Sequence, residues 1–401
     1  MKRLAFVVLL ALGACRPSSD PSLPAPSLTF STPTWPEPAW WPGAGNGRLV
    51  LSNSRDDTLS VLDATKVGQA TLPEVARVPV GLNPVEIEAP HHAAIAPDGS
   101  ALYVNLSEYA PGTGTGPHGA HGTGTIDGKV LKLDGATGHL LGTTRVDRNS
   151  GDLEVSPDGT LVAVTHYDLL RIQEAQAGTA PSPDARVVLI DTASMTQRAA
   201  VMVCAAPHGV RFSKDGKRLY VACYSDEVAV VQLDAKDFPV TRIKVAANAG
   251  TAFEARQTPY ALSVSPLTGD VFISCPRSGD VRVLTAALTI DDGRRTLLGG
   301  LPQLSGFSPD GTTLWVPTQG DDRVHAVDPL TGTRTASLNV PRDRCRNVHQ
   351  VLALSSTLLA VVCEGDHVAP GSLVVLGTDG TVKSVTDVGT FPDYIGLWRT
   401  P

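Results

Sequence analysis

Two stretches of the 401-residue chain place a cysteine four positions before a histidine that begins an apolar run. They read CAAPHGVRFS (204–213) and CRNVHQVLAL (345–354). Thiolate and imidazole groups are common ligands of zinc and copper, so each C-x-x-x-H motif is a candidate metal site. Covalent c-type haem needs C-x-x-C-H, which occurs nowhere in the sequence, and this excludes a covalently attached haem.

The elements that must position these motifs are copies of one repeated unit. The clearest copies are PHHAAIAPDGSALYVNLSE (90–108), PHGVRFSKDGKRLYVACYSDE (207–227) and PQLSGFSPDGTTLWVPTQGDD (302–322). Each copy holds an apolar strand, a tight turn of the P-D-G type and a second strand, and a third strand ending near aspartate follows. A period of about 40–45 residues with four antiparallel strands is typical of a β-propeller blade. Insertions at 107–128 and 167–185 lengthen the early units.

The two ends of the repeat region complement each other. Residues 48–63 read as a second and a third strand, and residues 392–401 read as a first strand. Joining them completes a seventh blade and removes exposed strand edges. We therefore expect an all-β fold, a seven-bladed β-propeller of four-stranded antiparallel blades over 45–401, closed by its C-terminal strand. Residues 1–15 are expected to be a signal peptide and 16–44 a tether rich in proline and serine.

The repeat motifs also resemble those of a known family. S-P-D-G turns, as in VSPDG (155–159), and V-x-V-x-D-like strands, as in VHAVD (324–328), resemble the YVTN family of β-propeller repeats of bacterial and archaeal surface and periplasmic proteins. The resemblance covers about 45–401 and implies a propeller at the cell envelope. The family is related in fold to the propellers of nitrite reductase, nitrous oxide reductase and lactonases, so the fold alone does not define the activity.

The N-terminal segment MKRLAFVVLLALGAC has a basic start and a short apolar run, and it is too short to span a bilayer. Its end resembles the lipobox of bacterial lipoproteins, which implies lipidation of Cys15. The arginine that follows implies the outer membrane, facing the periplasm or the cell surface. An ordinary secretory signal is the alternative interpretation. The expected partners are the membrane, through Cys15, and an envelope protein or a small polar ligand.

The remaining cysteines have defined places in the blades. Cys204 and Cys345 precede blade starts, and Cys223 and Cys363 fall at the ends of second strands. The start of a blade and the end of its second strand meet on one face, and disulfides form in exported proteins. We therefore predict the disulfides Cys204–Cys223 and Cys345–Cys363, with Cys275 a free, partly buried thiol.

The histidines gather on the face where the chain enters each blade. His91, His92, His208 and His349 begin first strands, which line the central channel. Three imidazoles with an open position are a common zinc or copper arrangement, and His91, His208 and His349 are spaced nearly evenly around the ring. Hydrogen bonding of these histidines to loop carbonyls, or a catalytic histidine, are the alternatives. The same ring of ligand candidates is completed by Tyr260, Gln303 and Asp393.

Secondary metal candidates lie in connections on the same face. They are His118 and His121 in a glycine-rich insertion, and His166 and His367 after second strands. The acidic doublets at 56–57, 226–227 and 321–322 are candidates for Ca²⁺, although acidic pairs also form turns.

The net charge of −7 is spread along the chain, which argues against a nucleic-acid partner. The sequence therefore predicts a lipid-anchored propeller of the cell envelope that acts as a binding or scaffold module, with its ligand or partner on the histidine-rich face. The alternative is a metal- or haem-dependent enzyme or cofactor-handling protein, such as an oxidoreductase accessory or a lactonase-like hydrolase. Zinc, copper and calcium are the candidate metals, and no catalytic residue is assigned.

Overall fold

The computed structural model describes residues 47–82, 87–107 and 121–398. The expected lipidation site Cys15, the proline-rich tether and His118 lie outside these residues.

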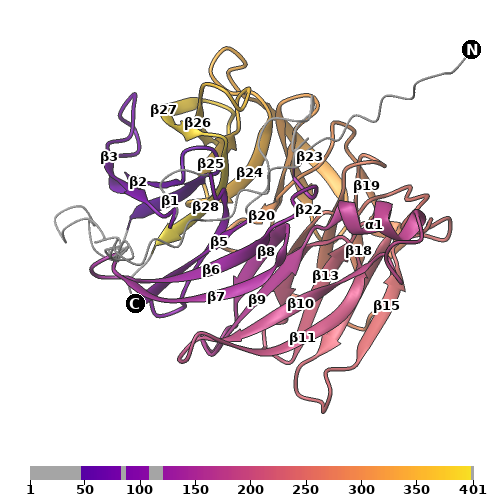
Figure 1. The fold of residues 1–401 in the computed structure, drawn as a ribbon. Coiled ribbons are helices and arrows are strands. Elements are labelled where there is room, and N and C mark those ends of the chain that lie inside the picture. Colours follow the sequence, from indigo (N-terminus) through magenta and orange to yellow (C-terminus); the bar gives the residue numbers. More distant parts are fainter. Residues whose placement is uncertain (1–46, 83–86, 108–120, 399–401) are drawn as a thin grey trace, which may run out of the picture. The chain divides into compact units, whose positions relative to one another are not determined.

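The described residues form seven four-stranded antiparallel sheets, and the chain is a seven-bladed β-propeller as the repeats predict (Figure 1). The blades, each from its innermost to its outermost strand, are the following: blade 1, β28 (Pro392–Trp398), β1 (Arg48–Asn53), β2 (Thr58–Asp63) and β3 (Glu74–Pro79); blade 2, β4 (Pro90–Ile95), β5 (Ala101–Leu106), β6 (Asp127–Asp134) and β7 (Leu140–Arg148); blade 3, β8 (Ser150–Val155), β9 (Leu161–His166), β10 (Asp184–Asp191) and β11 (Thr196–Ala205); blade 4, β12 (Pro207–Phe212), β13 (Arg218–Cys223), β14 (Glu227–Gln232) and β15 (Val240–Lys244); blade 5, β16 (Ala261–Val264), β17 (Val271–Cys275), β18 (Asp280–Leu284) and β19 (Thr296–Leu297); blade 6, β20 (Gly306–Phe307), β21 (Leu314–Thr318), β22 (Arg323–Asp328) and β23 (Thr333–Asn339); blade 7, β24 (Val348–Ala353), β25 (Leu358–Cys363), β26 (Pro370–Gly377) and β27 (Val382–Thr390).

The ring is closed by the C-terminal strand. In Figure 1, β28 (yellow) lies beside β1 (indigo), and the two pair antiparallel, with Leu49 opposite Leu397. Trp398 at the end of β28 is buried against Val50 and Leu102 of blades 1 and 2. Innermost strands contact one another from β28 through β4, β8 and β12 to β16, and from β20 through β24 back to β28. Pairing of the two chain ends leaves no blade with an open inner edge.

The apolar core lies between neighbouring blades. Side chains alternate between the two faces of a strand. In β13, Leu219 and Val221 pack toward blade 3, and Tyr220 and Ala222 pack toward blade 5. Because both faces are buried, the strand reads RLYVAC, a nearly continuous apolar run rather than an alternation. This packing fixes the inner strands, which carry the candidate site.

Aspartates that follow second strands tie the blades together. Asp57, Asp226 and Asp322 have positive φ angles of 49°, 63° and 51°. The carboxylate of Asp226 accepts hydrogen bonds from four backbone N–H groups between residues 250 and 258, at 2.7–2.8 Å. Asp57 accepts from the backbone of Glu88 and Ala89 in the same way. These contacts give the acidic doublets the turn-forming role that was one of their two predicted roles.

The insertion after β9 holds the helix α1 (Leu169–Gln176), which the sequence analysis does not predict. Asp168 caps it by accepting a hydrogen bond from the N–H of Arg171 at 3.0 Å. Two 3₁₀ turns, η2 (Ala64–Lys66) and η3 (Asp292–Arg294), complete the regular elements of the described residues. Within those residues no helix has the length and apolar character needed to span a bilayer.

Both predicted disulfides are present, and Cys275 is free. The Cα atoms are 5.9 Å apart in Cys204–Cys223 and 5.1 Å apart in Cys345–Cys363. Two details differ from the prediction. Cys204 belongs to β11, the outer strand of blade 3, so its disulfide joins two blades. Cys275 is fully rather than partly buried, because it ends β17 inside the core between blades.

Candidate functional site

Irregular pairing of the innermost strands concentrates polar side chains at the channel mouth. In β4, Pro90 pairs with Leu106 and Ala93 with Val104, so His91 and His92 together oppose one residue. This is a β-bulge, and it bends the strand so that consecutive side chains need not point to opposite faces. The ring centroids of His91 and His92 are consequently 4.4 Å apart. The same shift occurs in β12, where His208 lies in the bulge.

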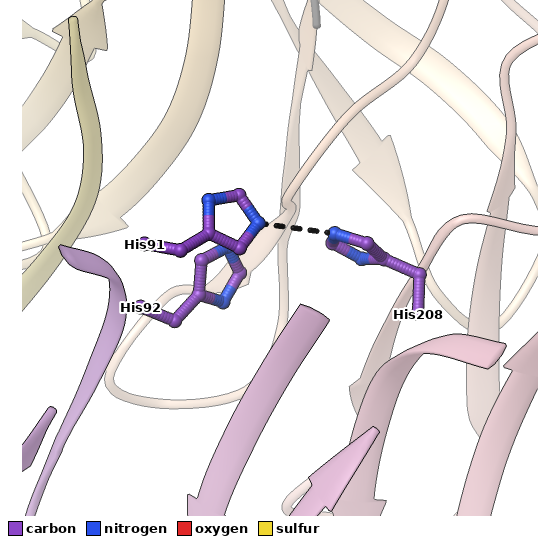
Figure 2. A group of neighbouring side chains, drawn as sticks. All are labelled: His91, His92 and His208. Carbon is purple, nitrogen blue, oxygen red and sulfur yellow. Dashed lines mark hydrogen bonds between the residues drawn. The ribbon is translucent and has the colours of Figure 1, made fainter. Parts of the chain in front are cut away.

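His91 and His208 face each other across the mouth. Their Nε2 atoms are 3.5 Å apart (Figure 2). The Nδ1 atom of His91 contacts the carboxylate of Asp393, and the Nδ1 atom of His208 lies 3.2 Å from the carbonyl oxygen of Tyr260. A neutral imidazole has one N–H donor, and both Nδ1 atoms face acceptors, so the protons belong on Nδ1. The two Nε2 lone pairs are thereby directed at each other.

His92 adds a third imidazole of the same kind. Its Nδ1 atom lies 2.6 Å from Oδ1 of Asp152, so this nitrogen is the donor. Its Nε2 atom is buried and has no hydrogen-bond partner among the described residues. One ring nitrogen from each of His91, His92 and His208 lies within 4.8 Å of the other two. In Figure 2, His91 and His92 lie on one side and His208 approaches from the other.

The spacing of this histidine cluster (His91, His92 and His208) matches the coordination of a transition-metal ion. Metal–nitrogen bonds of about 2.0–2.1 Å at a tetrahedral angle place two nitrogen ligands about 3.4 Å apart. The observed His91–His208 separation is 3.5 Å. Histidine ligands almost always donate their second N–H to a carboxylate or a carbonyl, as all three do here. The residues present therefore fit a zinc or copper ion.

A second cluster lies next to the first and shares Asp393 with it. His349, Glu364 and Asp393 have ligand atoms within 4.8 Å of one another. Oδ1 of Asp393 is 3.0 Å from Nδ1 of His349, while its Oδ2 contacts His91. Burial alone would lower the pKa of His349, but the charges of Glu364 and Asp393 raise it to about 9. His349 is thus a protonated imidazolium at neutral pH and balances the carboxylates around it.

Below the histidine cluster, Asp152 connects the mouth to the interior of the channel. Its Oδ2 atom is 2.5 Å from Nη1 of Arg211, while Oδ1 accepts from His92. Burial would raise the pKa of Asp152, but Arg211 and His92 hold it well below its usual range. Arg211, Glu154 and Tyr394 then line a channel cavity of about 570 Å³. Burial raises the pKa of Glu154 to about 7 despite the nearby Arg211.

The other predicted ring members lie around the histidine cluster. Tyr260 stacks on His208, with ring centroids 3.8 Å apart. His121 packs against His91 and His208, with centroids 4.1 and 5.4 Å away. Gln303 is buried, and its side-chain amide approaches Gln319 at 3.4 Å rather than the histidines.

The structure separates two of the secondary candidates from this cluster. His367 stacks on Phe391, with centroids 3.8 Å apart, and its Nε2 atom is 2.9 Å from Glu364. His166 is the last residue of β9 and lines a cavity between blades 2 and 3. The nearly even trio of His91, His208 and His349 is also rearranged, because His92 joins His91 and His208 while His349 lies with the carboxylates.

Sequence reasoning did not single out Asp152 and Glu364. Asp152 follows the aligned Gly151 as His92 follows His91, so reading the bulge as a two-residue unit would have found it. Glu364 directly follows Cys363 at the end of a second strand. The signal in each case was position in the repeat, one residue beyond the aligned site.

The fold and the site define a β-propeller with a polar, histidine-rich channel mouth. Seven-bladed propellers are also the solved structures that this chain resembles. It is similar to the periplasmic gluconolactonase PpgL of Pseudomonas aeruginosa, with 18% identity over 88% of this chain and 99% of that one and a TM-score of 0.63. It is similar to hydrazine synthase of Kuenenia stuttgartiensis, with 17% identity over 74% and 79% of the chains and a TM-score of 0.54.

A third similar structure is the dihydro-heme d1 dehydrogenase NirN, with 14% identity over 88% of this chain and 75% of that one and a TM-score of 0.56. At these identities the likeness shows the fold alone. No protein-family model and no curated protein sequence matches the chain.

Proposed function

We propose that this chain is an envelope-anchored binding propeller that holds a zinc or copper ion at its channel mouth through His91, His92 and His208. The observation that carries the proposal is the arrangement of these three buried imidazoles. Each Nδ1 atom faces an oxygen acceptor, and the Nε2 atoms of His91 and His208 are 3.5 Å apart. A bound ion with an open position would present a Lewis-acidic centre to a small polar ligand. The lipobox at Cys15 and the YVTN-like repeats support placement at the outer membrane.

Metal analysis of protein purified without a histidine tag tests this directly. We expect about one zinc or copper ion per chain, retained through dialysis. Cobalt substitution should give the visible absorption of a tetrahedral, nitrogen-rich site. His91→Ala and His208→Ala should each abolish stoichiometric binding, while His139→Ala, at an exposed histidine outside the cluster, should not. Failure of the unaltered protein to retain zinc or copper, or retention by both cluster variants, would refute the proposal.

A metal-dependent hydrolase is the second candidate. It is favoured by the imidazolium of His349, which shares Asp393 with His91 and would lie beside the ion as a proton donor. The likeness to a gluconolactonase structure agrees with this candidate. Turnover of aldonolactones that requires added metal and is lost in His349→Gln would establish it. Metal binding without turnover of lactones would leave the binding function alone.

A further inference from the structure

A second cavity, separate from the channel, opens between blades 2 and 3. It has a volume of about 460 Å³, and its wall is formed by residues of β6, β7, β9, β10 and β11 together with Arg171 of α1. No member of the histidine cluster or of the His349 cluster lines it. The volume is in the usual range for small-molecule sites, about 300–1,000 Å³.

The carboxylates of this wall are already neutralised. All four have an arginine partner at 3.0 Å or less: Asp127 with Arg145, Asp147 with Arg186, Asp168 with Arg148 and Asp184 with Arg242. Their remaining oxygen lone pairs can accept hydrogen bonds, but their charge is compensated. A ligand therefore meets fixed acceptors here rather than a site of net negative charge.

Two groups in the wall retain unused binding capacity. Arg171 has no ion pair and no side-chain hydrogen bond among the described residues, and its Nε atom is buried without an acceptor. The Nδ1 atom of His166 lies 2.7 Å from the carbonyl oxygen of Arg186, so Nδ1 is the donor and Nε2 carries the lone pair. His166 is only 1% exposed, and its Nε2 atom has no donor among the described residues. Burial also lowers the pKa of His166, which keeps the ring neutral at pH 7.

From this geometry we propose that the cavity binds a small carboxylic acid that also carries hydroxyl groups, such as a sugar acid. The guanidinium of Arg171 would receive the carboxylate, because its planar donors match the two carboxylate oxygens. A ligand hydroxyl would donate to Nε2 of His166, since a buried acceptor without a donor costs about 1–3 kcal/mol. Further hydroxyls would donate to the wall carboxylates Asp147 and Asp168.

A metal ion is a poorer occupant of this cavity. No third ligand atom lies close enough to His166 to form one of the metal-type clusters of the described residues. The nearby carboxylates are also engaged by arginines, which would have to be displaced. The proposal is independent of the metal site at the channel mouth.

Three ring compounds of similar size test the proposal by calorimetry on the full chain stripped of metal. Galacturonate combines a carboxylate with hydroxyls, galactose has hydroxyls only, and cyclohexanecarboxylate has a carboxylate only. We expect saturable 1:1 binding of galacturonate and affinities at least about tenfold weaker for the other two, the cost of losing one strong hydrogen bond. No saturable binding of galacturonate, or equal affinity for galactose, would overturn the proposal.

Variants locate the binding. Arg171→Met, at a helix surface, should weaken galacturonate binding by about tenfold or more. His166→Leu should weaken galacturonate but leave the weaker binding of cyclohexanecarboxylate unchanged, because that compound has no hydroxyl to lose. Arg198→Met removes an exposed charge from the same blade outside the cavity and should bind as the unaltered protein does. Full affinity in Arg171→Met would place the ligand elsewhere and reject the assignment.

Discussion

The Nε2 atoms of His91 and His208 lie 3.5 Å apart although 117 positions separate the two residues in the chain. Their approach depends on bulges in β4 and β12, which turn both rings toward the axis. Two lone pairs at this distance repel unless a proton or a cation lies between them. The metal-binding proposal and the first prediction follow from this relationship.

Asp393 should control metal affinity without binding the ion itself. Its carboxylate holds Nδ1 of His91 and of His349. Asp393→Asn removes the negative charge that orients and polarises His91, and loss of such a partner typically lowers metal affinity about 10–100-fold. Competition with a chromogenic chelator measures this. Asp387→Asn, at a largely exposed carboxylate on β27, is the matched control, and an equal effect of both changes would contradict the prediction.

The stability of the metal-free protein should fall at alkaline pH. Glu364 and Asp393 raise the pKa of His349 to about 9 in the folded protein, although burial opposes this shift. In the unfolded chain the pKa returns to about 6.5, so the folded state binds more protons between these values. The stabilisation is complete below about pH 6.5 and is lost as the pH rises through 9, by up to roughly 3 kcal/mol.

Urea unfolding between pH 6 and pH 10 tests this pH dependence. His349→Gln should flatten the decline, because the neutral side chain does not titrate. His139→Gln, at an exposed histidine, should leave it as it is. A decline of the same size in His349→Gln would show that another group is responsible.

The disulfide between Cys204 and Cys223 should stabilise the junction of blades 3 and 4. It closes a loop with a sequence separation of 19 residues. Replacing both cysteines by alanine should lower the free energy of unfolding by about 3 kcal/mol, mainly by releasing the unfolded chain. Denaturant midpoints under oxidising conditions measure the loss. Reduction of the unaltered protein should cost more, because it also opens Cys345–Cys363, and unchanged midpoints would count against this role.

Cys275 should be chemically silent in the folded protein. Burial raises the pKa of its thiol well above the usual value, and the reactive species is the thiolate. Iodoacetamide at pH 8 should therefore label Cys275 only after unfolding, as peptide mapping by mass spectrometry would show. Labelling of Cys275 in native protein would mean that the strand end of β17 opens readily.

Much of the fold could be predicted because its determinants are local or repeated. Turn motifs such as those at 155–159 and 308–311 mark the hairpin between first and second strands. Matching incomplete units at 48–63 and 392–401 predicted the ring closure that β28 and β1 form. The disulfides followed from the blade register in the same way. The helix α1 was missed because it lies in an insertion that the repeat does not constrain.

By itself, the sequence determined the repeat architecture, the closure of the propeller and the gathering of histidines on one face, because period-two patterns and turn residues act over a few positions. Only the tertiary structure decided which side chains meet. It placed Asp152 on His92, Asp393 between His91 and His349, and His208 opposite His91. Those distances depend on the bulges in the inner strands and on the radius at which seven twisted sheets pack, and both arise from the packing of the whole ring.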